Sequence, residues 1–142
     1  MFVFCGDKKS GKSNLILKFL DIQMSSAEDI KETAALDFKY GTKKREEQKV
    51  RIQSYELGGG RVLANMLQAA LRNVDKVASI CIVLDLSKPG NCVDSLLFWL
   101  KAVRHYCDNA LKELQNANIE KFREVQKRMS QYWNTVPAQN EK

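Results

Sequence analysis

Apolar residues form two continuous runs in this chain, and between them lie segments with alternating or helical spacing. The runs are Phe2–Cys5 and Ser79–Leu86. Continuous apolar runs of β-branched type are typical of strands buried on both faces, so we expect residues 79–86 in the middle of a partly parallel sheet. Residues 36–40 and 50–57 alternate apolar and polar positions and predict an antiparallel hairpin at the sheet edge.

Helical spacing occurs in four segments. Residues 12–21 and 61–72 carry apolar residues every three or four positions, and a longer amphipathic stretch covers residues 93–133. Asn116–Asn118 divides this stretch into two helices, and Pro89-Gly90 predicts a turn before it. We expect one stripe of the first of these helices to face the sheet: Leu96, Leu100, Val103, Cys107, Leu111 and Leu114.

The order of these elements is β-α-β-β-α-β-α-α. It predicts an α/β fold with a central, mostly parallel sheet and helices on both faces. Residues 25–33 are polar without a period and predict a loop. In the second C-terminal helix the aromatic and methionine side chains exceed what a four-stranded sheet can cover, which is typical of a partner surface, although packing within the domain is the main alternative. They are Phe122, Met129, Tyr132 and Trp133.

Composition narrows the class of protein. The 142 residues are 44% apolar and 28% charged, which is typical of a soluble globular domain and excludes a disordered or collagen-like chain. No apolar run is long enough to insert in a membrane. The first residues contain no basic leader, so we expect a cytoplasmic protein. The net charge of +6 suits an acidic partner such as a nucleotide. The basic cluster Lys43-Lys44-Arg45 lacks interleaved aromatic residues, which predicts a solvated loop and no nucleic-acid surface.

The cysteines and the single histidine give no sign of metal or thiol chemistry. Cys5 and Cys81 lie inside apolar runs, where a reduced cysteine behaves as a small hydrophobe. His105 has no companion at metal-ligand spacing. We therefore expect no zinc site and no Cys-His nucleophile.

One motif carries specific chemistry: residues 6–13 match GxxxxGK[ST] between a strand and an amphipathic helix. Glycines let the backbone form a nest of N–H groups for phosphate oxygens at a helix N-terminus. Lys12 would reach the β- and γ-phosphates, and Ser13 would offer its hydroxyl to Mg²⁺. This predicts a P-loop mononucleotide fold. The predicted nucleotide-binding residues are Gly6, Asp7, Lys8, Lys9, Ser10, Gly11, Lys12 and Ser13.

The other parts of a nucleotide site depart from the usual pattern. After the third strand, Glu56 stands where an Asp usually holds Mg²⁺, and Gly59 where a glycine contacts the γ-phosphate. Gly60 occupies the position of the residue that orients the attacking water, usually Gln. Thr33 could complete the Mg²⁺ shell, although a solvated loop threonine is an equal alternative. GTP, GDP or ATP with Mg²⁺ could occupy such a site, and an empty site is also compatible with it.

The chain also lacks a base-recognition element. No further apolar strand and no Asn/Thr-Lys-x-Asp run follows Leu86, so we expect the late strands of a Ras-like domain to be missing from this chain. We divide it into the front part of a P-loop domain (1–115), an additional amphipathic helix (116–136) and a flexible tail (137–142).

Four segments resemble the light intermediate chains of cytoplasmic dynein, in particular the dynein-2 type of cilia. They are FCGDKKSGKSNLILKFLD, ALDFKYG, ELGGG and IVLDLSKPGNCVDSLLFWL, in this order. The resemblance covers residues 2 to about 115, with a looser helical match beyond. The triple glycine and the SKP turn are its most diagnostic pieces, because ordinary small GTPases carry neither.

The resemblance implies a non-catalytic accessory subunit of dynein 2 whose Ras-like domain packs on the heavy-chain tail. Implied partners are the dynein-2 heavy chain, other dynein-2 subunits and the intraflagellar transport machinery. Implied locations are the cytoplasm, the cytoskeleton and the axoneme and basal body of the cilium. The main alternative is an active small GTPase or ATPase that switches on hydrolysis, which Glu56 and Gly60 disfavour. A P-loop kinase would need basic lid residues, for which Arg45 and Arg51 are the nearby candidates.

Overall fold

A computed structural model describes residues 1–20, 33–45 and 48–135 of the chain. The predicted loop at 25–33, apart from Thr33, and the predicted tail at 137–142 lie outside this part. The described elements are β1 (Phe2–Cys5), α1 (Lys12–Phe19), β2 (Leu36–Arg45), β3 (Gln48–Leu57), the 3₁₀ helix η2 (Gly60–Met66), α2 (Leu67–Ala70), the 3₁₀ helix η3 (Val74–Lys76), β4 (Ser79–Ile82), α3 (Pro89–Ala117) and α4 (Ile119–Thr135).

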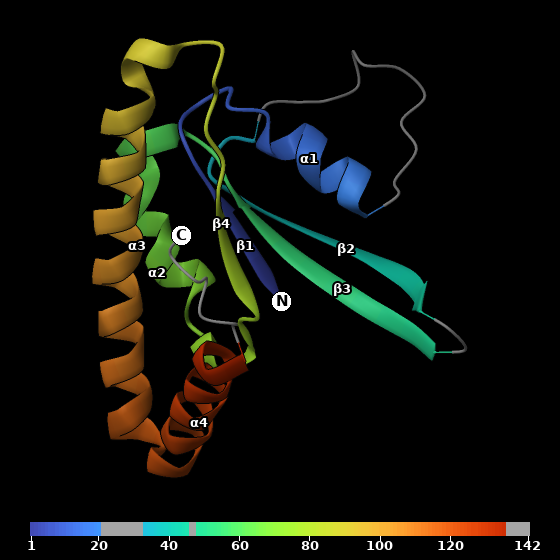
Figure 1. Cartoon of the computed structure of the whole chain (residues 1–142), viewed down its shortest axis with the longest axis vertical. Helices are drawn as coiled ribbons and strands as arrows, with labels where there is room; N and C mark the ends of the chain where they lie inside the picture. The colour runs from blue at the N-terminus through green and yellow to red at the C-terminus, as the bar shows by residue number, and fades with distance from the viewer. Residues whose placement is uncertain (21–32, 46–47, 136–142) are drawn as a thin grey trace, which may run out of the picture.

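The described strands form one mixed sheet in the order β2-β3-β1-β4 (Figure 1). β1 pairs in parallel with β3 and with β4, whereas β2 and β3 form the predicted antiparallel hairpin. This confirms an α/β domain with a partly parallel sheet. The hairpin strands are longer than predicted, and Lys43-Lys44-Arg45 belongs to β2, so the prediction of a loop there is wrong. Alternation of apolar and polar residues predicts a strand only where one face of it is apolar, and the ends of both hairpin strands near the turn are polar.

The run 79–86 is not a central strand. Its regular part ends at Ile82 and pairs with β1 alone, so β4 is an edge of the described sheet. The run is apolar because both of its faces contact other elements: Ile80 and Ile82 pack on one core cluster, Cys81 and Val83 on the other. Contact on both faces does not require a neighbour at both edges, and the sequence pattern cannot separate the two.

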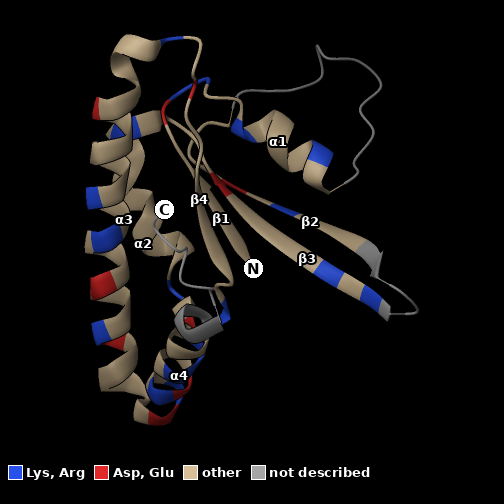
Figure 2. Ribbon diagram, viewed as in Figure 1, with Lys and Arg blue, Asp and Glu red and all other residues tan. Residues whose placement is uncertain are grey.

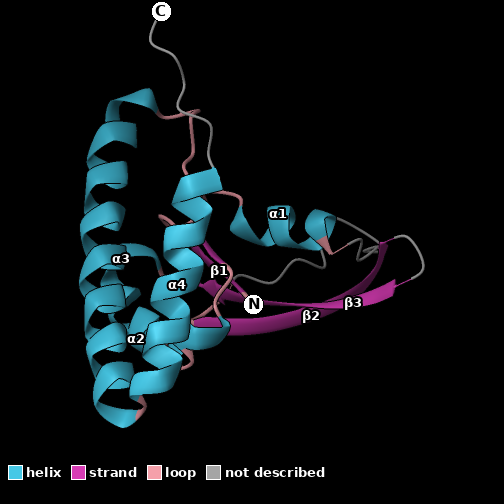
Figure 3. Cartoon of the chain, turned by 60° about the horizontal axis from the view of Figure 1, so that its bottom comes forward, coloured by secondary structure: helices cyan, strands magenta, loops and turns pink. Residues whose placement is uncertain are grey.

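Helices cover both faces of the sheet (Figure 3). Successive side chains of β1 alternate between the two sides. Val3 and Cys5 are fully buried in the cluster formed with α2 and α3, whereas Phe4 packs with Ile16 and Leu20 against α1. The P-loop connects these two layers, because it leaves β1 in the middle of the sheet and enters α1 on one face.

The helix α3 turns a different face to the sheet than predicted. The residues buried there are Ser95 and Trp99, whereas Leu96 and Leu100 are exposed. Val103 and Cys107 of the predicted stripe do pack on the core cluster. Ser95, on this buried face, hydrogen-bonds Asp7 of the P-loop. Pro89-Gly90 forms the first turn of α3, which makes the prediction of a separate turn wrong.

Two other helical predictions are confirmed with changes. The segment 61–72 is helical, but it consists mostly of the 3₁₀ helix η2 and only four residues of α2. The break between α3 and α4 falls at Asn118, which is extended and whose side-chain oxygen accepts the Lys121 N–H, an N-cap of α4.

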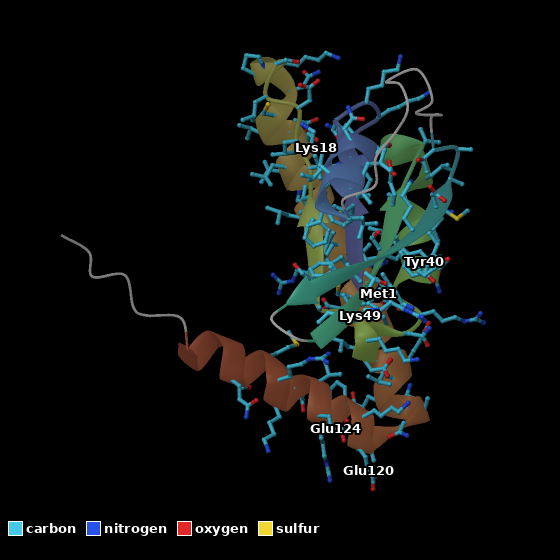
Figure 4. All side chains as sticks on the ribbon, turned by 90° about the vertical axis from the view of Figure 1, so that its right-hand side faces the viewer. Met1, Lys18, Tyr40, Lys49, Glu120 and Glu124 are labelled. Atoms are coloured by element: carbon cyan, nitrogen blue, oxygen red, sulfur yellow. The ribbon has the colours of Figure 1, made fainter. Side chains whose placement is uncertain are left out.

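The helix α4 packs against α3 and η3 and projects away from the sheet, and Glu120 and Glu124 lie on its exposed side (Figure 4). Val125 is buried, Phe122 is half-buried and Met129 is half exposed. The side chains of Tyr132 and Trp133 lie outside the described part. Among the described helices none is both long and apolar enough to cross a membrane.

Candidate functional site

The loop Gly6–Ser13 leaves the carboxyl end of β1 and enters α1, as the motif predicts. Lys9 and Gly11 adopt positive φ angles of 64° and 89°, and alternation of left-handed residues with right-handed ones is the backbone pattern of anion-binding nests. At Gly6 a Cβ atom would lie 2.2 Å from the carbonyl oxygen of Val83. Only glycine lets the loop pass this close to the end of β4.

Lys12 places its ammonium inside this loop. Its Nζ donates to the carbonyl oxygens of Gly6 (3.1 Å) and Asp7 (2.8 Å) and lies 3.4 Å from Ser10 Oγ. The side chain is almost fully buried. Burial lowers the pKa of Lys12, although the nearby Glu56 carboxylate opposes this shift. The loop thus holds a positive charge that suits phosphate oxygens next to the N-terminus of α1.

Glu56 lies at the end of β3, beside the start of α1. Its Oε1 accepts a hydrogen bond from Ser13 Oγ, and the residue is 2% exposed. The parallel register of β1 and β3 sets Glu56 opposite Phe4, two residues before the loop. The structure therefore brings together the two residues that the sequence predicted to meet at a metal or γ-phosphate.

Lys39 is a member of this site that the sequence analysis missed. Its Nζ lies 3.1 Å from Glu56 Oε2 and also bonds Asp37. Burial alone would lower the pKa of Lys39, but hydrogen bonds to Asp37 and Glu56 outweigh it and raise the pKa. One signal was available: in the alternating segment 36–40, Asp37 and Lys39 share one face of a strand. Acidic and basic segments of the hairpin lie together at this end of the sheet (Figure 2).

The three consecutive glycines form a turn that packs tightly around the loop. A Cβ at Gly58 would lie 2.0 Å from the carbonyl oxygen of Thr33. Gly59 and Gly60 have φ angles of 72° and 65°. A Cβ at Gly60 would also lie 2.9 Å from the backbone nitrogen of Lys8. The position that normally orients the attacking water is therefore held in a conformation and a space that disfavour any side chain.

A second polar group lies on the other side of the loop and was also missed. Asp7 Oδ1 accepts hydrogen bonds from Arg61 Nε (3.1 Å) and Trp99 Nε1 (2.9 Å). The same guanidinium donates to Asp94 at 2.6 Å and lies 5.1 Å from the ring centroid of Phe98. Burial would raise the pKa of Asp7, but bonds from Arg61, Trp99 and Ser95 outweigh it and lower the pKa. This group ties the loop to η2 and to α3.

A pocket of about 260 Å³ opens between the loop and the end of β3. Its lining contains most of the predicted site residues; Gly6 and Asp7 are the predicted residues that do not line it. The lining residues are Lys8, Lys9, Ser10, Gly11, Lys12, Ser13, Asn14, Thr33, Glu56, Gly58 and Gly59. Three lysines contribute to it, and Glu56 is the one acid among the lining residues. Its volume is close to the lower limit for small-molecule sites.

Magnesium fits these residues poorly. Its expected donors, Ser13 Oγ and Glu56, are hydrogen-bonded to each other, and the second oxygen of Glu56 faces the Lys39 ammonium. In the described residues no group of three or more His, Cys, Asp or Glu side chains could hold a metal ion. Thr33 lies at the pocket, but the loop before it is outside the described part.

The cysteines of the described part are all free. Burial raises the pKa of the Cys5 thiol to about 12, so this thiol stays protonated and is not a nucleophile. His105 is exposed and lies 3.2 Å from Asn109. Neither residue lines the pocket.

The fold and the site together define a P-loop-like α/β domain. The sequence matches the family model of the dynein light intermediate chain over residues 1–141, and the chain belongs to this family. It is similar to cytoplasmic dynein 2 light intermediate chain 1 of Rattus norvegicus, with 35% identity over 130 residues, or 89% of this chain and 36% of the relative. The Mus musculus protein is 33% identical over 137 residues, or 94% of this chain and 37% of the relative.

A dynein 1 relative is also similar. Cytoplasmic dynein 1 light intermediate chain 1 of Dictyostelium discoideum is 30% identical over 133 residues, which is 90% of this chain and 25% of that protein. The chain thus spans little more than a third of the length of the dynein 2 relatives. The family prediction made from the P-loop, the triple glycine and the SKP turn is confirmed.

Proposed function

We propose that this chain is a non-catalytic accessory subunit of a cytoplasmic dynein 2 motor complex. Similarity to dynein 2 light intermediate chains over 89–94% of the chain supports this assignment. In this role it supports assembly and stability of the motor, with the dynein-2 heavy chain and other dynein-2 subunits as partners. It acts in retrograde intraflagellar transport with the transport machinery, in the cytoplasm and cytoskeleton and at the axoneme and basal body of the cilium.

We further propose that its Ras-like P-loop domain binds a guanine or adenine nucleotide through the phosphates and does not turn it over. Lys12 and the backbone of the loop supply the phosphate contacts. One observation carries the non-catalytic part: Gly60 lies against the Lys8 backbone with a positive φ angle. No side chain is available there to orient a water molecule, a role that a glutamine fills in GTPases.

The nucleotide part is tested by equilibrium binding of a fluorescent GDP or ADP analogue to the purified chain. Lys12→Ala is expected to abolish binding, and Lys18→Ala is the matched control, because Lys18 lies on the same helix but is exposed (Figure 4). Equal binding by wild type and Lys12→Ala would contradict the assignment of the loop.

The subunit part is tested by affinity purification of the tagged chain from ciliated cells. We expect the dynein-2 heavy chain to co-purify with wild type and with Lys12→Ala alike, because a static nucleotide site is not needed for docking. Loss of the chain is expected to leave short or swollen cilia with stalled transport particles. A chain that never recovers dynein, from cells whose cilia tolerate its loss, would overturn the proposal.

The alternative is a nucleotide switch, and the placement of Ser13 and Glu56 at one pocket favours it, because active P-loop proteins hold Mg²⁺ through a serine or threonine of the loop and an acidic residue. Single-turnover hydrolysis separates the two. The static site predicts a rate no faster than the slow intrinsic rate of unassisted GTPases, on the order of 10⁻⁴ s⁻¹. A rate approaching about 1 s⁻¹ without any partner would favour the switch.

A further inference from the structure

We infer that the nucleotide site of this chain works without a divalent cation, because the Lys39 ammonium is the permanent counter-ion of Glu56. The inference rests on the nucleotide binding proposed above. It concerns the one acid among the residues that line the pocket, and the side chain that neutralises it from β2.

Both oxygens of Glu56 already have partners. Ser13 Oγ donates to Oε1, and Lys39 Nζ lies 3.1 Å from Oε2. Glu56 is 2% exposed and the Lys39 side chain 21% exposed. A buried carboxylate needs a compensating charge, and here a side chain supplies it. In a magnesium-dependent site the ion itself supplies that charge.

The backbone ladder holds Lys39 at this place. β2 and β3 pair so that Asp37 lies opposite Glu56 and Lys39 opposite Ser54. Ser54 Oγ donates to the Lys39 carbonyl oxygen at 3.2 Å, and the Asp37 carboxylate binds the ammonium from the other side. Lys39 therefore comes from the paired part of a strand, and it does not depend on the loop before Thr33.

This arrangement opposes Mg²⁺ in two ways. The ammonium repels a second cation at the same carboxylate, and it reduces the negative charge that would attract one. Mg²⁺ also needs near-ideal octahedral geometry and loses water reluctantly, whereas the donors here are already hydrogen-bonded to one another. Phosphate charge then meets the Lys12 ammonium inside the loop, and Lys8 and Lys9 also line the pocket.

The test is equilibrium binding of a fluorescent GDP or ADP analogue to the full 142-residue chain, in excess magnesium chloride and in excess EDTA. The expected dissociation constants agree within about twofold. Weakening by about tenfold or more in EDTA would overturn the inference while leaving the proposed nucleotide binding intact. Absence of binding in both buffers by a folded chain would overturn both.

Variants of Lys39 sharpen this test. Lys39→Gln frees the Glu56 charge, so its binding is expected to become about tenfold tighter with magnesium than with EDTA. Lys39→Arg keeps the charge and is expected to remain insensitive to magnesium. Lys49→Gln is the control, because Lys49 is exposed on β3 (Figure 4). A magnesium-insensitive Lys39→Gln that still binds nucleotide would contradict the role of Lys39, and if this variant does not fold, the wild-type comparison decides.

Discussion

The two sides of the P-loop each carry a carboxylate bound to a basic side chain, but the two groups differ in burial. On the β3 side, Glu56 is 2% exposed and pairs with Lys39. On the α3 side, Asp7 and Arg61 are each 34% exposed. The same pairing chemistry therefore has different consequences: a buried charge that loses its partner is costly, whereas a solvated pair contributes little. The first group contains the acid that lines the pocket, and the second ties the loop to η2 and α3.

Removing the positive charge of Lys39 is expected to have the largest effect on the free energy of unfolding. Lys39→Gln leaves Glu56 with its Ser13 hydrogen bond but without a counter-charge, and we expect a loss of about 2 to 3 kcal/mol in the free energy of unfolding. Lys39→Arg should recover most of it. Urea unfolding measures both, with Lys49→Gln as the control. Equal stability of Lys39→Gln and wild type would mean that the two sides do not differ in the way burial predicts.

The glycine turn that joins the two sides gives the next largest effect. Gly60→Ala forces a Cβ into a left-handed conformation and to 2.9 Å from the Lys8 nitrogen, so we expect a loss of about 1 to 2 kcal/mol. Gly90→Ala is the matched control, because Gly90 lies in the first turn of α3 with open space around it. This control should be neutral or slightly stabilising.

A corollary concerns catalysis. Gly60→Gln should lose stability for the same reason as Gly60→Ala and should not raise the hydrolysis rate, since its side chain cannot enter the turn without displacing the loop. Single-turnover hydrolysis measures this. A large gain in rate would show that the turn is adaptable and that only the missing side chain prevents catalysis.

The partly exposed group should give a smaller effect that depends on salt. Arg61→Gln removes the pair with Asp7 and with Asp94, but water can replace it at these carboxylates. We expect a smaller loss of stability than for Lys39→Gln, and one that shrinks further at high ionic strength. Thermal unfolding at low and high salt checks this. If Arg61→Gln instead lost as much stability as Lys39→Gln, and lost it equally at low and high salt, the two groups would not differ in the way that their burial predicts.

The smallest of these effects is expected in the pH dependence of stability, which should differ between the Asp7–Arg61 group and the Glu56–Lys39 group. Because the pKa of Asp7 is lowered in the fold, its contribution is present above the ordinary carboxyl pKa of about 3.9 and is lost as the pH falls through the folded value. The pKa of Lys39 is raised, so its contribution is present below about 10.4 and is lost as the pH rises through the folded value. Arg61→Gln should flatten the acid limb and Lys39→Gln the alkaline limb.

The sequence predicted the parts of this molecule that depend on local pattern. The strand, loop and helix around Gly6–Ser13, the hairpin, and the break at Asn118 all follow from spacing and from residue types with fixed conformational preferences. The run 79–86 was misplaced because an apolar strand looks the same whether its neighbours are strands or helices.

Lys39, Arg61 and Trp99 could not be found as members of the site in the same way. Each meets its carboxylate across a large separation in the chain, 17, 54 and 92 residues, and their contacts exist only once the sheet and α3 have assembled. The buried face of α3 illustrates the same point. Ser95 is buried beside the P-loop, and its burial depends on how α3 packs. The local spacing of residue types predicts helices and strands. Which charged side chains pair with one another depends on the register of the strands and on the packing of α3.

The hydrogen bond from Trp99 to Asp7 gives the domain an internal optical reporter. The indole is fully buried and its N–H reaches into the P-loop. Indole emission responds to a change at its N–H and in the polarity around its ring, so a movement of the loop changes the light that this side chain emits. The chain has two tryptophans, and Trp133→Phe leaves Trp99 as the single indole. Events at the pocket then become visible in unlabelled protein.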